Sequence, residues 1–248
     1  MNSKLAIINV GVNASSPIKS PRLPDGKFEF VPIEQTDSKK DGFPLSKCEY
    51  LPLYQELPTG YMKPEKFVQE KYWTRRAHMD PEFVSFTYGD FPDEKRNRGR
   101  AGNLKQLNEG GFLFFLARLC DWDNGFKEKA GFYLVGYFEI ESIHKTIQSR
   151  PSDNEIESIR NNAHIKIAMW LEEQGKLDAW IKESDTGLWV FKGSPKSQLF
   201  HRSVPFDWKI AHDVLRDRYG RRLRRNGGTE LQRIGSYTRA CKIIDQQE

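Results

Sequence analysis

The chain has 248 residues, of which 38% are hydrophobic, 12% aromatic and 29% charged, with a formal net charge of +5 at pH 7. This composition excludes wholesale disorder and provides enough apolar side chains for the core of one large or two small domains. No stretch approaches the roughly 18 apolar residues of a membrane span, and the three widely spaced cysteines form no CxxC pair, so we expect a cytoplasmic protein without a transmembrane segment, a disulfide framework or a bound metal ion.

The first third of the chain predicts short strands joined by irregular segments. Residues 4–12 predict a buried first strand, and residues 22–33 predict a hairpin because Pro-Asp-Gly supplies its turn. Residues 34–64 contain several prolines and are expected to be irregular. A short helix is predicted at residues 66–76, and the sequence EFVSFTY predicts a strand at residues 82–88.

Two runs rich in aromatic and β-branched residues, at 111–119 and 131–140, are the strongest strand signals in the chain. A polar loop joins them, so we expect adjacent antiparallel strands. Both faces of these strands are apolar, which predicts a sheet that packs against a helix or closes into a barrel. Gly136 lies inside the second run, where glycine indicates a bulge or a close backbone approach.

The last hundred residues predict helices around one late strand. Ser152 and Glu155 match a capping box and indicate a helix start, and residues 161–164 interrupt or end that helix. Residues 187–192 predict a strand. Asp207 is expected to cap a helix that runs to about Tyr219.

The excess positive charge lies near the C-terminal end. Residues 213–239 contain eight arginines and three acidic residues, a surplus of five charges that equals the net charge of the whole chain. Arg221, Arg222, Arg224 and Arg225 lie within five residues, so this segment is either a solvated helix end or a patch that contacts DNA phosphates.

These elements predict an α+β fold whose mixed, mostly antiparallel sheet has the barrel-like character of PUA and ASCH domains. We expect one domain over residues 1–205. A basic, helical extension over residues 206–248 would pack on this domain. The sequence leaves the oligomeric state open.

Carboxylate, cationic and aromatic side chains concentrate between residues 75 and 100, which makes this segment the best candidate for a site. Asp80 follows His78, and Asp90 follows Tyr88 and Gly89. Ten residues of extended chain span roughly 33 Å. The two aspartates are therefore alternative catalytic carboxylates unless the flanking turns fold back, and each could instead be a turn residue.

Further residues are candidates for binding a nucleic acid. Candidates for contacting a base are Tyr88, Asn9, Asn13, His78 and His164, and candidates for contacting phosphates are Arg75, Arg76, Arg98 and Arg100. Core packing of the aromatic and loop stabilisation by the amides are the competing interpretations. The chain contains no HExxH, GxSxG or GxGxxG motif and no nucleotide-binding P-loop, so we expect no cofactor.

Several blocks, in matching order, resemble the third type of the nucleotide-modification-associated domain family. The blocks that carry the resemblance lie at residues 8–33, 78–90, 107–119, 131–140, 161–164 and 191–205. This family occurs in bacteria, archaea and phages and is linked to systems that make, read or destroy modified bases in DNA. The resemblance therefore implies double-stranded DNA with modified bases as the partner and a role in defence against phages.

Three functions are compatible with this context. The first is an N-glycosylase that flips out and excises a hypermodified pyrimidine, such as glucosylated hydroxymethylcytosine, with Asp80 or Asp90 stabilising the positive charge at C1′. The second is a non-catalytic reader of modified bases built on a PUA- or ASCH-like barrel. The third is an enzyme that installs a modification, although the sequence shows no site for a group donor. The glycosylase is favoured because it needs neither a metal nor a nucleotide cofactor.

Overall fold

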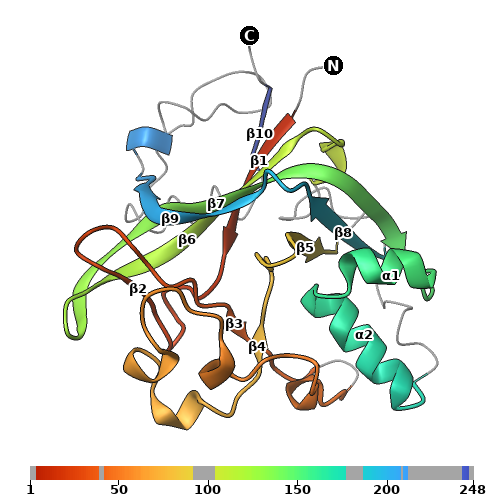
Figure 1. Ribbon diagram of the computed structural model, residues 1–248, viewed down its shortest axis with the longest axis horizontal. Coiled ribbons are helices and arrows are strands. Elements are labelled where there is room, and N and C mark those ends of the chain that lie inside the picture. The colour runs from red at the N-terminus through yellow and green to blue at the C-terminus, as the bar shows by residue number, and fades with distance from the viewer. Residues whose placement is uncertain are drawn as a thin grey trace.

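The computed structural model describes residues 4–38, 42–91, 104–176, 187–207, 209–211 and 242–245. Within them, one eight-stranded sheet forms the centre of the molecule (Figure 1). Its strands are β1 (Lys4–Val10), β2 (Ser20–Arg22), β5 (Thr87–Asp90), β6 (Phe112–Trp122), β7 (Phe126–Ile147), β8 (Leu188–Gly193), β9 (Gln198–Pro205) and β10 (Lys242–Asp245).

The main path of the sheet runs in the order β10-β1-β6-β7-β8-β5, with β2 beside β6 and β9 beside β7. The β1–β6 and β2–β6 pairs are parallel, and the other pairs in the sheet are antiparallel. The α+β class and the mostly antiparallel sheet are thereby confirmed. The expected barrel is corrected to a curved, open sheet among the described strands, because β10 and β5 lie at opposite ends of that path.

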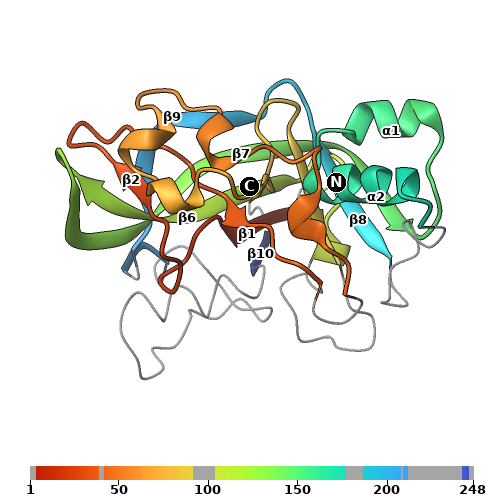
Figure 2. The ribbon, with the colours of Figure 1, turned by 90° about the horizontal axis from the view of Figure 1, so that it is seen from below.

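The two strongest strand predictions are confirmed as the antiparallel pair β6 and β7, which forms the long curved ribbon of Figures 1 and 2. The register shifts between Phe115, opposite Gly136, and Leu116, opposite Leu134. A Cβ atom on Gly136 would lie 2.5 Å from the carbonyl oxygen of Gln198 in β9. Gly136 therefore permits both the bulge and the close approach of β9.

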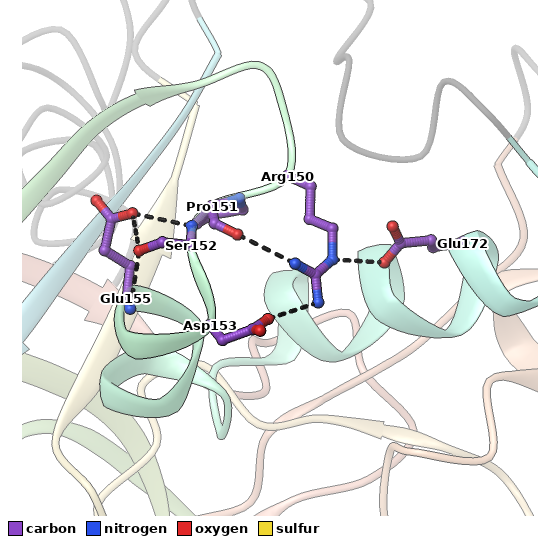
Figure 3. Close-up of polar contacts among 6 residues, drawn as sticks. All are labelled: Arg150, Pro151, Ser152, Asp153, Glu155 and Glu172. Carbon is purple, nitrogen blue, oxygen red and sulfur yellow. Dashed lines mark hydrogen bonds and ion pairs between the residues drawn. The ribbon is translucent and has the colours of Figure 1, made fainter.

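Two helices cover one end of the sheet: α1 (Asp153–Ile159) and α2 (Ala163–Glu173). Ser152 caps α1 through the predicted capping box. Arg150 links the two helices because its guanidinium contacts Asp153 Oδ1 at 2.9 Å and Glu172 Oε2 at 3.3 Å (Figure 3). Buried side chains of both helices pack against β8, which matches the late strand predicted at 187–192.

The helix predicted at residues 66–76 is wrong. Two 3-10 turns take its place, at Pro64–Lys66 and Glu70–Tyr72. The indole of Trp73 donates to the carbonyl oxygen of Val68 at 2.8 Å, which is the oxygen that residue 72 would use in an α-helix. The backbone N–H of Tyr72 bonds instead to Gln69. The indole of Trp73 thus occupies an acceptor that a regular α-helix would use, and the backbone forms tighter 3-10 turns instead.

The remaining predictions on the fold have mixed outcomes. The turn of the predicted hairpin at 22–33 is present, since Leu23 N–H donates to Lys27 O at 2.7 Å. Asp207 Oδ1 accepts from Ile210 N–H at 2.9 Å, but the rest of the predicted helix lies outside the described residues. The division at residue 205 stays a prediction. No described helix has the length and apolar content to traverse a bilayer.

Candidate functional site

A polar cavity of about 310 Å³ lies between the end of β1, the start of α2, strand β5 and a small two-stranded sheet. That small sheet pairs β3 (Ile33–Glu34) with β4 (Ala77–His78). Two other cavities, of about 330 and 320 Å³, have no histidine in their linings. The polar side chains that line this one are Asn9, Glu34, Gln35, Thr36, His78, Asp80, Asp90 and His164.

Asp80 and Asp90 line the same cavity because the chain between them folds back, the case in which the two aspartates were expected to share a site. The predicted strand at 82–88 begins only at Thr87. Before it, Glu82 and Thr87 exchange two backbone hydrogen bonds of 2.8 and 3.0 Å, and the Glu82 carboxylate accepts from Ser85 N–H at 2.9 Å. This turn folds the chain back and brings Gly89 N–H to 2.9 Å from Asp80 Oδ1. The separation of roughly 33 Å holds only for an extended chain.

The Asp80 carboxylate is held by groups from two elements. Its side chain is 4% exposed, and Oδ1 accepts from Gly89 N–H and from Asn162 Nδ2, the latter at 3.2 Å. Oδ2 lies 3.5 Å from His164 Nε2. Asn162 also caps α2, where its Oδ1 accepts from His164 N–H at 3.0 Å. The helix start therefore fixes His164 beside Asp80.

His78 completes a compact group with Asp80 and His164. Its Nδ1 lies 2.7 Å from Gln35 Oε1, and its ring meets the His164 ring edge-on at a centroid distance of 4.6 Å. One ligand atom from each of the three side chains lies within 4.8 Å of the others, a grouping able to hold a metal ion. The sequence indicates this grouping only through the His-x-Asp pattern at 78–80, because His164 is remote in the chain.

Tyr88 orients Asp90. The hydroxyl of Tyr88 donates to Asp90 Oδ2 at 2.9 Å, and Phe91 N–H donates to Oδ1 at 2.8 Å. The Tyr88 ring is 1% exposed and packs against Phe115 and Phe191, with centroids at 5.7 and 6.4 Å. The expected stacking of Tyr88 on a base is therefore corrected, since a base cannot reach this ring without opening the core.

The other predicted site residues line or adjoin the cavity, bond to groups elsewhere, or lie outside the described residues. Asn9 lines the cavity, whereas Asn13 Oδ1 accepts from the backbone and hydroxyl of Ser15 and stabilises a loop. Arg75 binds Glu34, a cavity residue, at 2.8 Å, and this hydrogen bond raises the pKa of Arg75. Arg76 donates to the carbonyl oxygen of Leu51. Six predicted arginines lie outside the described residues: Arg98, Arg100, Arg221, Arg222, Arg224 and Arg225.

Three polar residues that line the cavity were not recognised in the sequence: Glu34, Gln35 and Thr36. They belong to a segment predicted as irregular, in which no local pattern distinguishes them. Gly89 has a steric role, because a Cβ atom at this position would lie 2.8 Å from His164 Cδ2 and 3.0 Å from Asn162 Oδ1.

The substitution Gly89→Ala is expected to lower the free energy of unfolding by about 1–3 kcal/mol, the usual cost of overpacking. The new methyl group displaces the His164 ring and the Asn162 cap. Urea unfolding measures the loss, and the two-dimensional NMR signals of the histidine rings report the displacement. Gly60→Ala is the control because nothing lies within 4 Å of its Cβ position. Equal stability and an unchanged His164 signal in Gly89→Ala would contradict this packing.

Comparison with protein families gives one match. The family described as nucleotide modification associated domain 3 matches residues 4–214, most of the chain, and this range includes every residue that lines the cavity. No curated protein and no solved structure matches the chain.

Proposed function

The chain belongs to the nucleotide modification associated domain 3 family, and from this premise we propose that it excises a modified base from DNA at the polar cavity. The membership by itself associates the chain with nucleotide modification. The observation that carries the proposal is the convergence of Asp80, Asp90, His78 and His164 on one cavity of about 310 Å³. This volume is at the lower end of the range for small-molecule sites and accommodates a single base.

The reaction that suits these groups is hydrolysis of the N-glycosidic bond. The target nucleotide would rotate out of the duplex and place its base in the cavity. As the bond between C1′ and the base nitrogen breaks, positive charge develops on the sugar, and a carboxylate beside C1′ stabilises it. The oxygen of a water molecule then bonds to C1′, and a proton of that water goes to the departing base.

Asp90 is the carboxylate that we assign to the sugar. Two donors, the Tyr88 hydroxyl and Phe91 N–H, set its orientation at the cavity wall. Asp80 is nearly buried and lies 3.5 Å from His164 Nε2, so we assign it no contact with the sugar. Asn9 lines the cavity, and we assign its side-chain amide to the polar edge of the base.

A panel of DNA duplexes tests this proposal. The protein is incubated with duplexes that carry cytosine, hydroxymethylcytosine, glucosylated hydroxymethylcytosine or deazaguanine. Abasic sites are detected by alkaline cleavage, and the released base is identified by mass spectrometry. We expect release from at least one modified duplex and none from cytosine. Tight binding to a modified duplex without any release would favour the non-catalytic reader instead.

Affinity for DNA is expected to depend on the arginine-rich segment. Replacing Arg221, Arg222, Arg224 and Arg225 together by Ala removes four cationic groups. The slope of log affinity against log salt concentration should flatten by about 0.9 for each phosphate that the variant no longer neutralises. Fluorescence anisotropy between 50 and 300 mM salt, roughly the range in which this dependence is steep, measures the slope. An unchanged slope in the quadruple variant would place the DNA path elsewhere.

A further inference from the structure

We propose that His78, Asp80 and His164 bind one divalent first-row transition metal ion at the wall of the cavity. The inference deepens the proposed function, on which the catalytic role of the ion rests. Binding of the ion itself requires neither DNA nor turnover. The three side chains come from β4, the segment after it and α2, and one ligand atom from each lies within 4.8 Å of the others.

The distances fit an ion after a small contraction. Around a tetrahedral ion with bonds of about 2.1 Å, neighbouring ligand atoms are separated by roughly 3.4 Å. The pair His164 Nε2 and Asp80 Oδ2 already lies at 3.5 Å. Because no pair in the group is more than 4.8 Å apart, the widest pair would close by at most roughly 1.4 Å on binding. The two imidazole rings are tilted by 72°, so they meet edge to face rather than stacking flat.

Neighbouring polar groups hold the three side chains as a metal site requires. Gln35 Oε1 can only accept, so the neutral His78 tautomer that makes this bond carries its proton on Nδ1 and its lone pair on Nε2. Gly89 N–H and Asn162 Nδ2 both donate to Asp80 Oδ1, which turns Oδ2 toward His164. Such supporting hydrogen bonds orient metal-binding histidines and carboxylates, and losing one typically weakens binding 10- to 100-fold.

The donor set selects the class of ion. Two imidazoles and one carboxylate suit zinc, iron, cobalt or nickel, whereas magnesium and calcium prefer sites made of oxygen alone. Three protein ligands leave at least one position for water on a tetrahedral or larger coordination sphere. Because the group lines the same cavity as Asp90, an ion there would acidify a bound water, which is the nucleophile that hydrolysis of the glycosidic bond needs.

Binding is tested with tag-free protein, because a polyhistidine tag would itself bind the ions. The protein is treated with a chelator, dialysed and titrated separately with zinc chloride and cobalt chloride. Elemental analysis after equilibrium dialysis gives the stoichiometry, and the visible absorption of cobalt reports its coordination. We expect one ion per chain. His78→Gln and His164→Ala should each weaken binding at least 100-fold, and Gln35→Ala about 10- to 100-fold.

Controls and contrary outcomes separate the metal site from the reaction. His201→Ala and Asp123→Asn alter exposed residues that do not line the cavity and should bind the ion as the wild type does. Circular dichroism checks that each variant is folded. The proposal is overturned if the wild type binds no ion stoichiometrically, or if folded His78→Gln and His164→Ala variants bind as tightly as the wild type. Asp90→Asn removes no ligand of the group and should retain the ion, so a missing glycosylase activity leaves the metal result intact.

Discussion

Asp90→Asn is expected to lower the rate of base release by about 10²- to 10⁴-fold, the range associated with losing a positioned catalytic group. The amide keeps the size of the side chain but carries no negative charge to stabilise the sugar at C1′. The Tyr88 hydroxyl and Phe91 N–H that orient the carboxylate remain in place. Single-turnover kinetics on the modified duplex that the wild type cleaves measures the effect, and anisotropy measures DNA affinity, which should change little.

Two comparisons make this result specific. Asp123→Asn makes the same chemical change at an exposed position outside the cavity and should retain the wild-type rate. Tyr88→Phe keeps the buried ring but removes the hydroxyl that orients Asp90, so its rate should fall between the other two. A folded Asp90→Asn protein with the wild-type rate would assign the reaction to other residues.

Phe138→Ala is expected to lower the free energy of unfolding by about 3–5 kcal/mol, the usual cost of deleting a buried phenyl group. Phe138 is 0% exposed. Its ring makes edge contacts with Phe83, Phe86 and Phe115 at centroid distances of 5.5, 5.7 and 4.6 Å. The substitution therefore leaves a void at the centre of the sheet's core, and urea unfolding monitored by circular dichroism measures the loss.

The void also lies next to the turn that builds the cavity. Phe83 and Phe86 belong to the segment between Asp80 and Asp90, so the loss of Phe138 should loosen the fold-back that joins Asp80 to Gly89. Val84→Ala is the matched control because Val84, in the same turn, is 75% exposed and should change stability by less than about 0.5 kcal/mol. A similar loss in both variants would show that the ring cluster does not anchor this turn.

Local signals in the sequence were enough to predict several elements. The β6–β7 pair follows from two apolar runs joined by a polar loop, and the start of α1 follows from Ser152 and Glu155. The bulge predicted at Gly136 is confirmed by the register shift between β6 and β7. Each of these features depends on residues near one another in the chain, where side-chain alternation, capping and backbone freedom act directly. The helix predicted at 66–76 was wrong because packing of aromatic residues outweighed local propensity there.

Only the tertiary structure determined which candidate residues line one cavity. The sequence singled out Asp80, Asp90, His78 and His164, but the extended-chain distance separated the two aspartates, and His164 had no evident link to either. Asn162 and Asp80, which bond to each other, are 82 residues apart. The turn from Glu82 to Thr87 and the cap of α2 bring these groups to one cavity. Distances of this kind depend on the place of β5 in the sheet and on where α2 packs against the sheet. Both are properties of the whole fold that no local pattern in the chain contains.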